Sequence, residues 1–127
     1  MSKLLIDTSV IIDFLRRKDK GNSLFYRLAG EDLAISVVTH TELFSGKSVW
    51  ERPDIRKIIK DVLSGVNILP FTLEISEKAG YLKAKNSKSS LLDAIIAATS
   101  ISHGLELVTL NIKDFNVFDG VKLHSLA

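Results

Sequence analysis

The sequence of 127 residues contains no cysteine. This absence excludes a disulfide framework, a thiol nucleophile and a cysteine-rich zinc site, so any chemistry must come from oxygen and nitrogen groups. Long hydrophobic runs are missing as well, because the longest, residues 94–98, is far shorter than the ~20 residues that cross a bilayer. The apolar stretch near the start, residues 4–6, is too short for the core of a signal peptide. We therefore expect a soluble, cytoplasmic protein without a membrane partner.

The chain also carries little net charge. The formal value at pH 7 is +2, which by itself does not indicate a nucleic-acid-binding protein. The basic residues nevertheless form clusters, which are Arg16, Arg17, Lys18 and Lys20; Arg52, Arg56, Lys57 and Lys60; and Lys78, Lys83, Lys85 and Lys88. Solvated helix faces explain such clusters at least as well as a track for phosphates, and both interpretations stay open.

Short apolar segments alternate with helical patterns in a composition typical of one globular domain, residues 1–127. Strands are predicted at residues 3–6, 33–36, 66–69 and 105–110, with a candidate fifth strand at 121–123. Helices are predicted at 10–15, within 21–30, from Thr39 to Gly46, from Pro53 to Gly65, and at 72–85 and 91–103. This order predicts an α/β three-layer sandwich with a central, mainly parallel sheet of four or five strands.

Acidic residues and one amide fall where the predicted strands end or the helices begin. Asp7 follows the first strand, and Glu42 lies in the first turn after the second. Asp93 lies in the first turn of the helix before the fourth strand, Asn111 follows that strand, and Asp114 comes three residues later. Helices that connect parallel strands begin near the strands' carboxyl ends. These side chains are therefore predicted to share the edge where open α/β sheets bind ligands.

Such a group of carboxylates predicts a divalent metal site. Crowded carboxylates raise one another's pKa unless a cation neutralises them. Oxygen ligands favour Mg²⁺, with Mn²⁺ as the alternative, and the natural chemistry is phosphodiester hydrolysis, with one ion or with a second ~3.5–4 Å away. Ser9 and Thr109 are candidates for orienting a carboxylate or a ligand water, although hydroxyl residues are common at strand ends.

The same positions also fit a structural interpretation. Glu42 stands three residues after Thr39, and Asp93 three after a serine, which is the spacing of a capping box. Asp7 could accept hydrogen bonds in a local turn, and Asn111 could be an ordinary turn residue. The shared edge is what favours a site over a set of unrelated caps.

Four sequence blocks resemble the PIN-domain ribonucleases, in particular the VapC-like toxins of type II toxin–antitoxin pairs. The blocks are LLIDTSVIID at 4–13, ISVVTHTEL at 35–43, LDAIIAA at 92–98 and LVTLNIKDF at 107–115. They occur in this order over almost the whole chain. The combination is specific, although each block alone is short.

The resemblance implies a PIN-like fold and an endoribonuclease that depends on Mg²⁺ or Mn²⁺. Asp7, Glu42 and Asp93 match the family's acidic, metal-binding triad. Either Asn111 or Asp114 fills the fourth catalytic position, and a neutral Asn111 would weaken a second metal site. The resemblance also implies a homodimer and a small VapB-like antitoxin that blocks the acidic cleft, often with an arginine.

Contacts with RNA are expected to differ from those of the family. The loop at 86–90, NSKSS, lacks the arginine-and-glycine pattern often found there. The candidates for holding the RNA backbone are Arg16, Arg17, Lys85 and Lys88.

Two rival functions stay open. One is a catalytically silent PIN-like module that binds RNA or protein, and the other is a phosphatase for small substrates, which would need a closed pocket.

Overall fold

Four short strands form a parallel sheet in the computed structural model, which describes residues 4–125. They are β1 (Leu4–Ile6), β2 (Leu33–Ser36), β3 (Asn67–Leu69) and β4 (Glu106–Val108), in the order β3-β2-β1-β4. Every residue of β1 and β2 is buried, because helices cover both faces of a parallel sheet. The predicted mainly parallel sheet is confirmed.

Successive strand residues face opposite sides of the sheet and enter two separate hydrophobic clusters. Leu5 and Leu107 belong to one cluster, whereas Leu4, Ile6 and Val108 belong to the other. This alternation is the ordinary two-residue period of a strand. Each face of the sheet is therefore sealed by its own set of helices.

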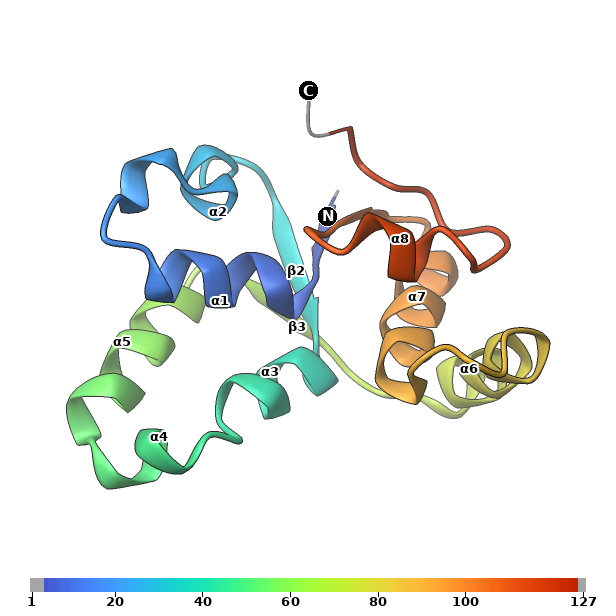
Figure 1. Ribbon diagram of the computed structural model, residues 1–127, viewed down its shortest axis with the longest axis horizontal. Helices are drawn as coiled ribbons and strands as arrows, with labels where there is room; N and C mark the ends of the chain where they lie inside the picture. Colours follow the sequence, from blue (N-terminus) through green and yellow to red (C-terminus); the bar gives the residue numbers. More distant parts are fainter. Residues whose placement is uncertain (1–3, 126–127) are drawn as a thin grey trace.

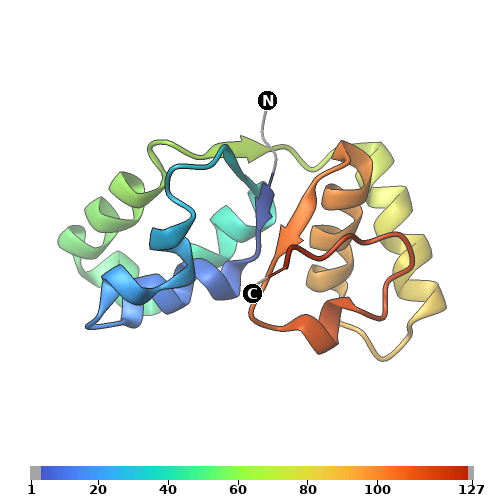
Figure 2. The same cartoon turned by 90° about the horizontal axis from the view of Figure 1, so that it is seen from above.

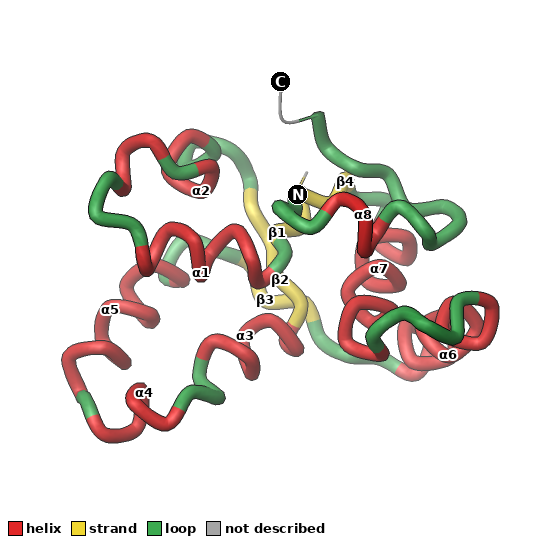
Figure 3. The backbone as a smooth tube through the Cα atoms, viewed as in Figure 1, coloured by secondary structure: helices red, strands yellow, loops and turns green. Residues whose placement is uncertain are grey.

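Those helices make the domain a three-layer sandwich (Figures 1 and 2). One layer contains α1 (Thr8–Arg16), the 3₁₀ turn η1 (Lys20–Asn22), α2 (Leu24–Arg27), α4 (Lys47–Glu51) and α5 (Pro53–Leu63), and the other contains α6 (Leu73–Lys85), α7 (Leu91–His103) and α8 (Ile112–Phe115). Between them, α3 (Val37–Leu43) contributes Leu43 to the cluster that contains Leu4 and Ile6 and packs Val38 against the cluster that contains Leu5. In Figure 3 the strands separate the two layers.

The central strand β1 marks the point where the winding of the sheet reverses. The chain proceeds from β1 to β2 and β3 on one side, and then returns to place β4 on the other side of β1. Open α/β sheets bind ligands at such a switch point, outside the carboxyl ends of the strands. Asp7 follows β1 and Thr109 follows β4, so the fold places both at this crevice.

Two helix boundaries predicted near this edge are wrong. Helix α3 begins directly after β2 and not at Thr39, because Ser36 Oγ accepts a hydrogen bond from the backbone N–H of Val38 (3.1 Å) and caps the helix. The helix ends at Leu43, before Gly46, which was expected to close it. Gly46 is instead the N-cap of α4, a short helix that the sequence pattern does not predict.

The candidate fifth strand at 121–123 is reduced to an isolated bridge between Leu107 and Leu123. The backbone N–H of Leu107 donates to the carbonyl of Lys122, and that of His124 donates to the carbonyl of Leu107, both at 2.8 Å. These bonds hold the segment against β4, but they do not extend into a ladder. The sheet therefore has four strands within the described residues.

Helix α7 is confirmed at both predicted ends. Ser90 caps its start, and Gly104 ends it with a φ of 64°, in the left-handed conformation that glycine adopts without strain. Residues 94–100 are all buried, as its apolar sequence predicts. The helix has only 13 residues, and no helix in the part of the chain that the structure describes is long and apolar enough to cross a membrane.

Leu82→Ala is expected to lower the free energy of unfolding by about 2–5 kcal/mol, because this side chain is 1% exposed in the cluster between α6 and α7. Leu73→Ala is the matched control in the same helix, since Leu73 is 86% exposed and its loss should cost less than about 0.5 kcal/mol. Urea unfolding followed by circular dichroism measures both. Equal losses would contradict the packing of α6.

Candidate active site

Asp7 lies at the junction of β1 and α1 and is only 3% exposed. It occupies the N-cap position of α1, but its side chain makes no capping hydrogen bond. Its Oδ2 instead accepts hydrogen bonds from Ser9 Oγ (2.6 Å) and Thr109 Oγ1 (2.8 Å), so the expected orienting role of both hydroxyls is confirmed. Within residues 4–125 its Oδ1 accepts no hydrogen bond, which leaves this oxygen available to a ligand.

The sequence pattern predicts Glu42 in the first turn of a helix. In the structure it lies near the end of α3 instead. Because Ser36 caps α3, Thr39 lies inside the helix, and the capping-box interpretation of Glu42 is wrong. Glu42 Oε1 accepts a hydrogen bond from Thr8 Oγ1 (2.7 Å), and the same hydroxyl lies 3.0 Å from Thr39 Oγ1. Thr8 is the neighbour of Asp7, so the start of α1 fixes the positions of both carboxylates.

Asp93 lies in the first turn of α7, where its backbone N–H donates to Ser90 Oγ (3.4 Å). Its serine cap is thus confirmed. Burial, followed by the negative charges of Asp7, Asp114 and Glu42, raises the pKa of Asp93 from 3.8 to about 6. Each of these carboxylates is therefore close enough for its charge to disfavour the ionised form of Asp93.

The two candidates for the fourth position occupy different places at the start of α8. Asn111 is the N-cap residue, but its side chain makes no capping bond, and its backbone N–H donates to Thr109 Oγ1 (2.9 Å). Asp114 raises the pKa of Asp93 and lines a groove together with it. The structure therefore places Asp114 near Asp93, whereas the backbone of Asn111 is linked to Asp7 through the hydroxyl of Thr109.

Asp7, Glu42, Asp93 and Asp114, here called the acidic cluster, suit a divalent cation. Carboxylate oxygens are the preferred ligands of Mg²⁺ and Mn²⁺, and a cation would relieve the repulsion that, after burial, raises the pKa of Asp93. Across residues 4–125, no three histidine or acidic side chains lie close enough to enclose a metal ion by themselves. Mg²⁺ tolerates such an open arrangement, because it commonly binds one or two carboxylates and keeps several waters.

A groove of about 620 Å³ opens beside Asp93 and Asp114. Lys85, Lys88 and Lys113 line it together with the loop that follows α6, and we call it the lysine groove. Figure 2 shows this loop and α8 on the same side of the molecule. Cationic side chains thus stand next to the acidic cluster, an arrangement suited to a phosphate-bearing ligand that also binds a metal ion.

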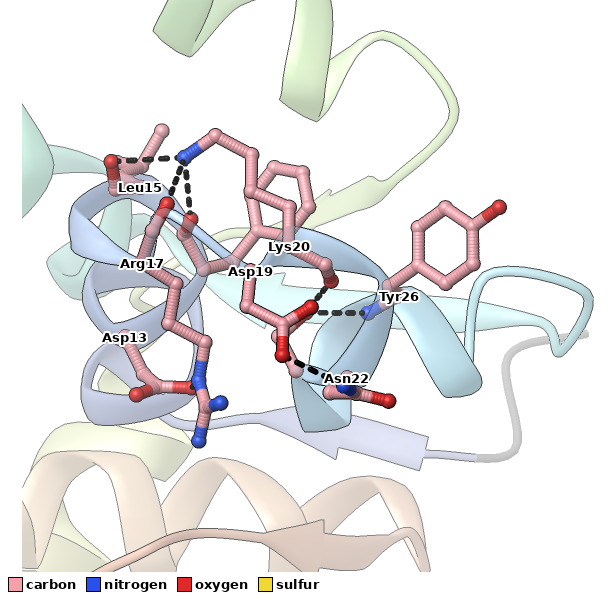
Figure 4. A network of polar contacts seen from close by, with 9 residues as sticks. Asp13, Leu15, Arg17, Asp19, Lys20, Asn22 and Tyr26 are labelled. Carbon is pink, nitrogen blue, oxygen red and sulfur yellow. Dashed lines mark hydrogen bonds and ion pairs between the residues drawn. The ribbon is translucent and has the colours of Figure 1, made fainter.

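The other predicted basic contacts lie elsewhere. Arg16 and Arg17 are at the far end of α1 from the acidic cluster, about 13 Å along a helix of nine residues. Arg17 forms an ion pair with Asp13 (2.9 Å), and Lys20 Nζ donates to the carbonyl oxygens of Leu15 and Arg17 (Figure 4). The Lys20 contacts give the carbonyl groups at the end of α1 a hydrogen-bond donor. The structure does not bring this basic cluster to the acids.

Sequence reasoning does not single out Thr8 or Lys113. Thr8 holds Glu42 across 34 positions of sequence, and Lys113 reaches the lysine groove from α8. Their only sequence signal is adjacency, because Thr8 follows Asp7 and Lys113 precedes Asp114. Both roles depend on contacts between distant segments, which spacing alone does not reveal.

Comparison with known proteins shows similarity along nearly the whole chain. A family model described as PIN domain matches residues 4–121, a segment that contains the entire acidic cluster. Ribonuclease VapC2 of Haemophilus influenzae is 33% identical over 121 residues, 91% of each chain, and ribonuclease VapC10 of Mycobacterium tuberculosis is 31% identical over 124 residues, 94% of this chain and 90% of that one. A chain in the solved structure of a toxin–antitoxin complex from Klebsiella pneumoniae is 33% identical, with a TM-score of 0.73 and coverage of 94% of this chain and 95% of that one.

Asp93→Asn is expected to stabilise the metal-free protein at pH 7.5. The folded-state pKa of Asp93 lies above its ordinary 3.8, so its favourable contribution is complete below about pH 4 and is lost as the pH rises through about 6. The variant should therefore gain about 1–2 kcal/mol at pH 7.5, after discounting for solvent screening, and little at pH 4. Urea unfolding in EDTA at both pH values measures the difference.

Asp54→Asn is the control of opposite sign, because Arg52, at 2.7 Å, lowers the pKa of Asp54. This variant should gain no stability at pH 7.5. A stability gain for Asp93→Asn that is the same at both pH values would contradict the repulsion among the acids.

Proposed function

The chain belongs to the PIN-domain family, and on this premise we propose that it is a divalent-metal-dependent endoribonuclease that hydrolyses RNA phosphodiester bonds. The acidic cluster is its active site. The proposal is supported by the two curated relatives, which are named ribonucleases and are matched over nine-tenths of their length.

The observation that carries the proposal is that Asp7, Asp114 and Glu42 all lie close enough to Asp93 for their charges to act on it. Together with burial, these charges raise the pKa of Asp93 to about 6, and a set of unrelated helix caps would have no reason to gather around it in this way. Neither Asp7 nor Glu42 caps a helix with its side chain, so a catalytically silent module leaves these two positions unexplained. A binding site for a divalent cation explains them.

Within this cluster the residues divide the work. When bound, Mg²⁺ or Mn²⁺ polarises the scissile phosphate and lowers the pKa of a water molecule. Asp7 and Asp93 would hold the ion, and Asp7 is suited to this because Ser9 and Thr109 fix its Oδ2 while Oδ1 stays free. Glu42 would accept the proton of the attacking water through the carboxylate oxygen that α1 does not hold.

We assign the fourth position to Asp114. Its charge acts on Asp93, and it lines the lysine groove, whereas Asn111 adds no charge and does not line that groove. The groove is lined mainly by exposed side chains, including Lys85 and Lys88. This supports a polymeric substrate over a small phosphorylated molecule, which would need a closed pocket.

The proposal includes a protein partner. The solved Klebsiella pneumoniae structure is a toxin–antitoxin complex, which supports a small VapB-like antitoxin for this chain. A cationic side chain of such a partner, placed in the acidic cluster, would neutralise it as a metal ion does and would exclude RNA. A homodimer and a cytoplasmic location complete the proposal.

Asp7→Asn and Asp93→Asn are each expected to lower the rate of RNA cleavage by about 10²–10⁴-fold, because each removes a negative charge that holds the metal ion and its water. Gel analysis of a labelled single-stranded RNA, with Mg²⁺ and with EDTA, measures the rates. Asp61→Asn is the control, since Asp61 lies on the exposed face of α5 beside Lys57 (3.1 Å). This variant should cleave RNA at the wild-type rate. Equal cleavage by wild type and Asp7→Asn, or cleavage in EDTA, would end the proposal.

Asp114→Asn should reduce cleavage at least tenfold more than Asn111→Ala does. The reason is that Asp114 contributes charge beside Asp93, whereas the side chain of Asn111 makes no hydrogen bond to the acids within residues 4–125. The same gel assay at saturating Mg²⁺ measures both variants. A greater loss for Asn111→Ala would move the fourth position to Asn111.

A further inference from the structure

A second hollow, of about 330 Å³, continues the lysine groove away from the acidic cluster. It shares Lys85, Asn86 and Val117 with the groove, so the two hollows adjoin each other at these residues. Tyr81 and Asp119 line only the second hollow. A chain that is bound at Asp93 and passes Lys85 therefore arrives at Tyr81.

Tyr81 is an aromatic residue that belongs to neither hydrophobic cluster. Its side chain is 52% exposed, whereas its neighbour Leu82 is 1% exposed and packs in the core. Lys78 and Lys85 lie three residues before and four after it, on the same helix face, with their Nζ atoms 5.1 and 5.8 Å from its ring centroid. The result is an exposed ring between two cations on flexible stems.

The cations along this path are free to bind an anion. Within residues 4–125, no carboxylate lies within 4 Å of the ammonium groups of Lys78, Lys85, Lys88 or Lys113. Lys83, in contrast, donates to the carbonyl oxygens of loop residues and is not available. The same helix thus uses Lys83 to shape the loop, while Lys78 and Lys85 contact the Tyr81 ring and have no carboxylate partner within residues 4–125.

The negative charge of Asp119 affects which part of a nucleotide the second hollow can bind. Its carboxylate repels a phosphate, but it can accept a hydrogen bond from the exocyclic amino group of a base. Aromatic rings stack bases of single strands, and lysines beside them follow the backbone. Chemistry within the hollow therefore favours a base over a phosphate.

We propose that Tyr81 is a stacking platform for one base of single-stranded RNA, at a position that flanks the cleaved phosphate, while Lys78 and Lys85 bind the adjoining phosphates. The inference rests on the proposed ribonuclease function and adds a substrate subsite to it. It also restricts the substrate, because a paired base inside a duplex is not available to stack on Tyr81.

Binding of a fluorescein-labelled, 12-nucleotide single-stranded RNA of mixed sequence, followed by anisotropy in EDTA, tests the inference without cleavage of the probe. Tyr81→Leu is expected to weaken binding roughly tenfold, because it removes one stacked base. Tyr81→Phe keeps the ring and should bind within about twofold of wild type. The same RNA as a duplex should bind more weakly and be insensitive to Tyr81→Leu.

A second measurement tests the phosphate contacts. Lys85→Ala should reduce the slope of the logarithm of affinity against the logarithm of salt concentration by about 0.7, the value for one lost phosphate contact on a single strand. Lys57→Ala is the matched control, since Lys57 lies on α5 in the other helix layer and pairs with Asp61 (Figure 1). Its slope should equal that of wild type.

The inference is overturned if Tyr81→Leu binds like wild type, if Tyr81→Phe loses as much affinity as Tyr81→Leu, or if the duplex is bound as tightly as the single strand. Circular dichroism and thermal melting confirm that the variants are folded. Failure here is distinguishable from failure of the ribonuclease proposal, because Asp93→Asn would still lower the rate of RNA cleavage while Tyr81→Leu left RNA binding unchanged.

Discussion

Mutual repulsion among carboxylates at the end of β1 is the constraint on which the rest of the site depends. A parallel sheet creates it, because strand ends and helix starts meet at one edge and bring Asp7 and Asp93 together, and Thr8 at the start of α1 holds Glu42 beside them. Hydroxyl groups hold two of the side chains in place, since Thr109 donates to Asp7 and Thr8 donates to Glu42. Asp93 has no such donor within residues 4–125, and its pKa is raised to about 6. A divalent cation relieves the repulsion that remains.

The two hydrophobic clusters hold the edge of the sheet together despite the repulsion among its carboxylates. Leu5 and Leu107 seal one face of the sheet and Ile6 and Val108 the other, so β1 and β4 cannot separate without exposing both clusters. The loop after α6 belongs to the same arrangement, because Lys83 fixes its carbonyl groups beside the acids. The strands thus hold the acidic cluster, and the loop after α6 lines the adjoining lysine groove.

The order of the strands and of the longer helices could be predicted from sequence, and so could the edge of the sheet that carries the candidate site, because hydrophobic periodicity and caps are local signals. Ser90 and Gly104 mark both ends of α7, and the acids stand directly beside those signals. Glu42 was misplaced because two hydroxyl residues compete to start α3, and the backbone contact of Ser36 decides between them. The choice between Asn111 and Asp114, and the path of the lysine groove, depend on how α8 packs against α7, which no local pattern encodes.

Calorimetric titration of Mn²⁺ into the protein at pH 6, in two buffers of different ionisation enthalpy, tests the central claim most directly. Binding of the ion to the acidic cluster should release about half a proton, because it lowers a pKa of about 6 on Asp93. Asp93→Asn should bind at least tenfold more weakly and release no proton. Equal affinity and equal proton release in the two proteins would contradict a metal site built on the repulsion among these carboxylates.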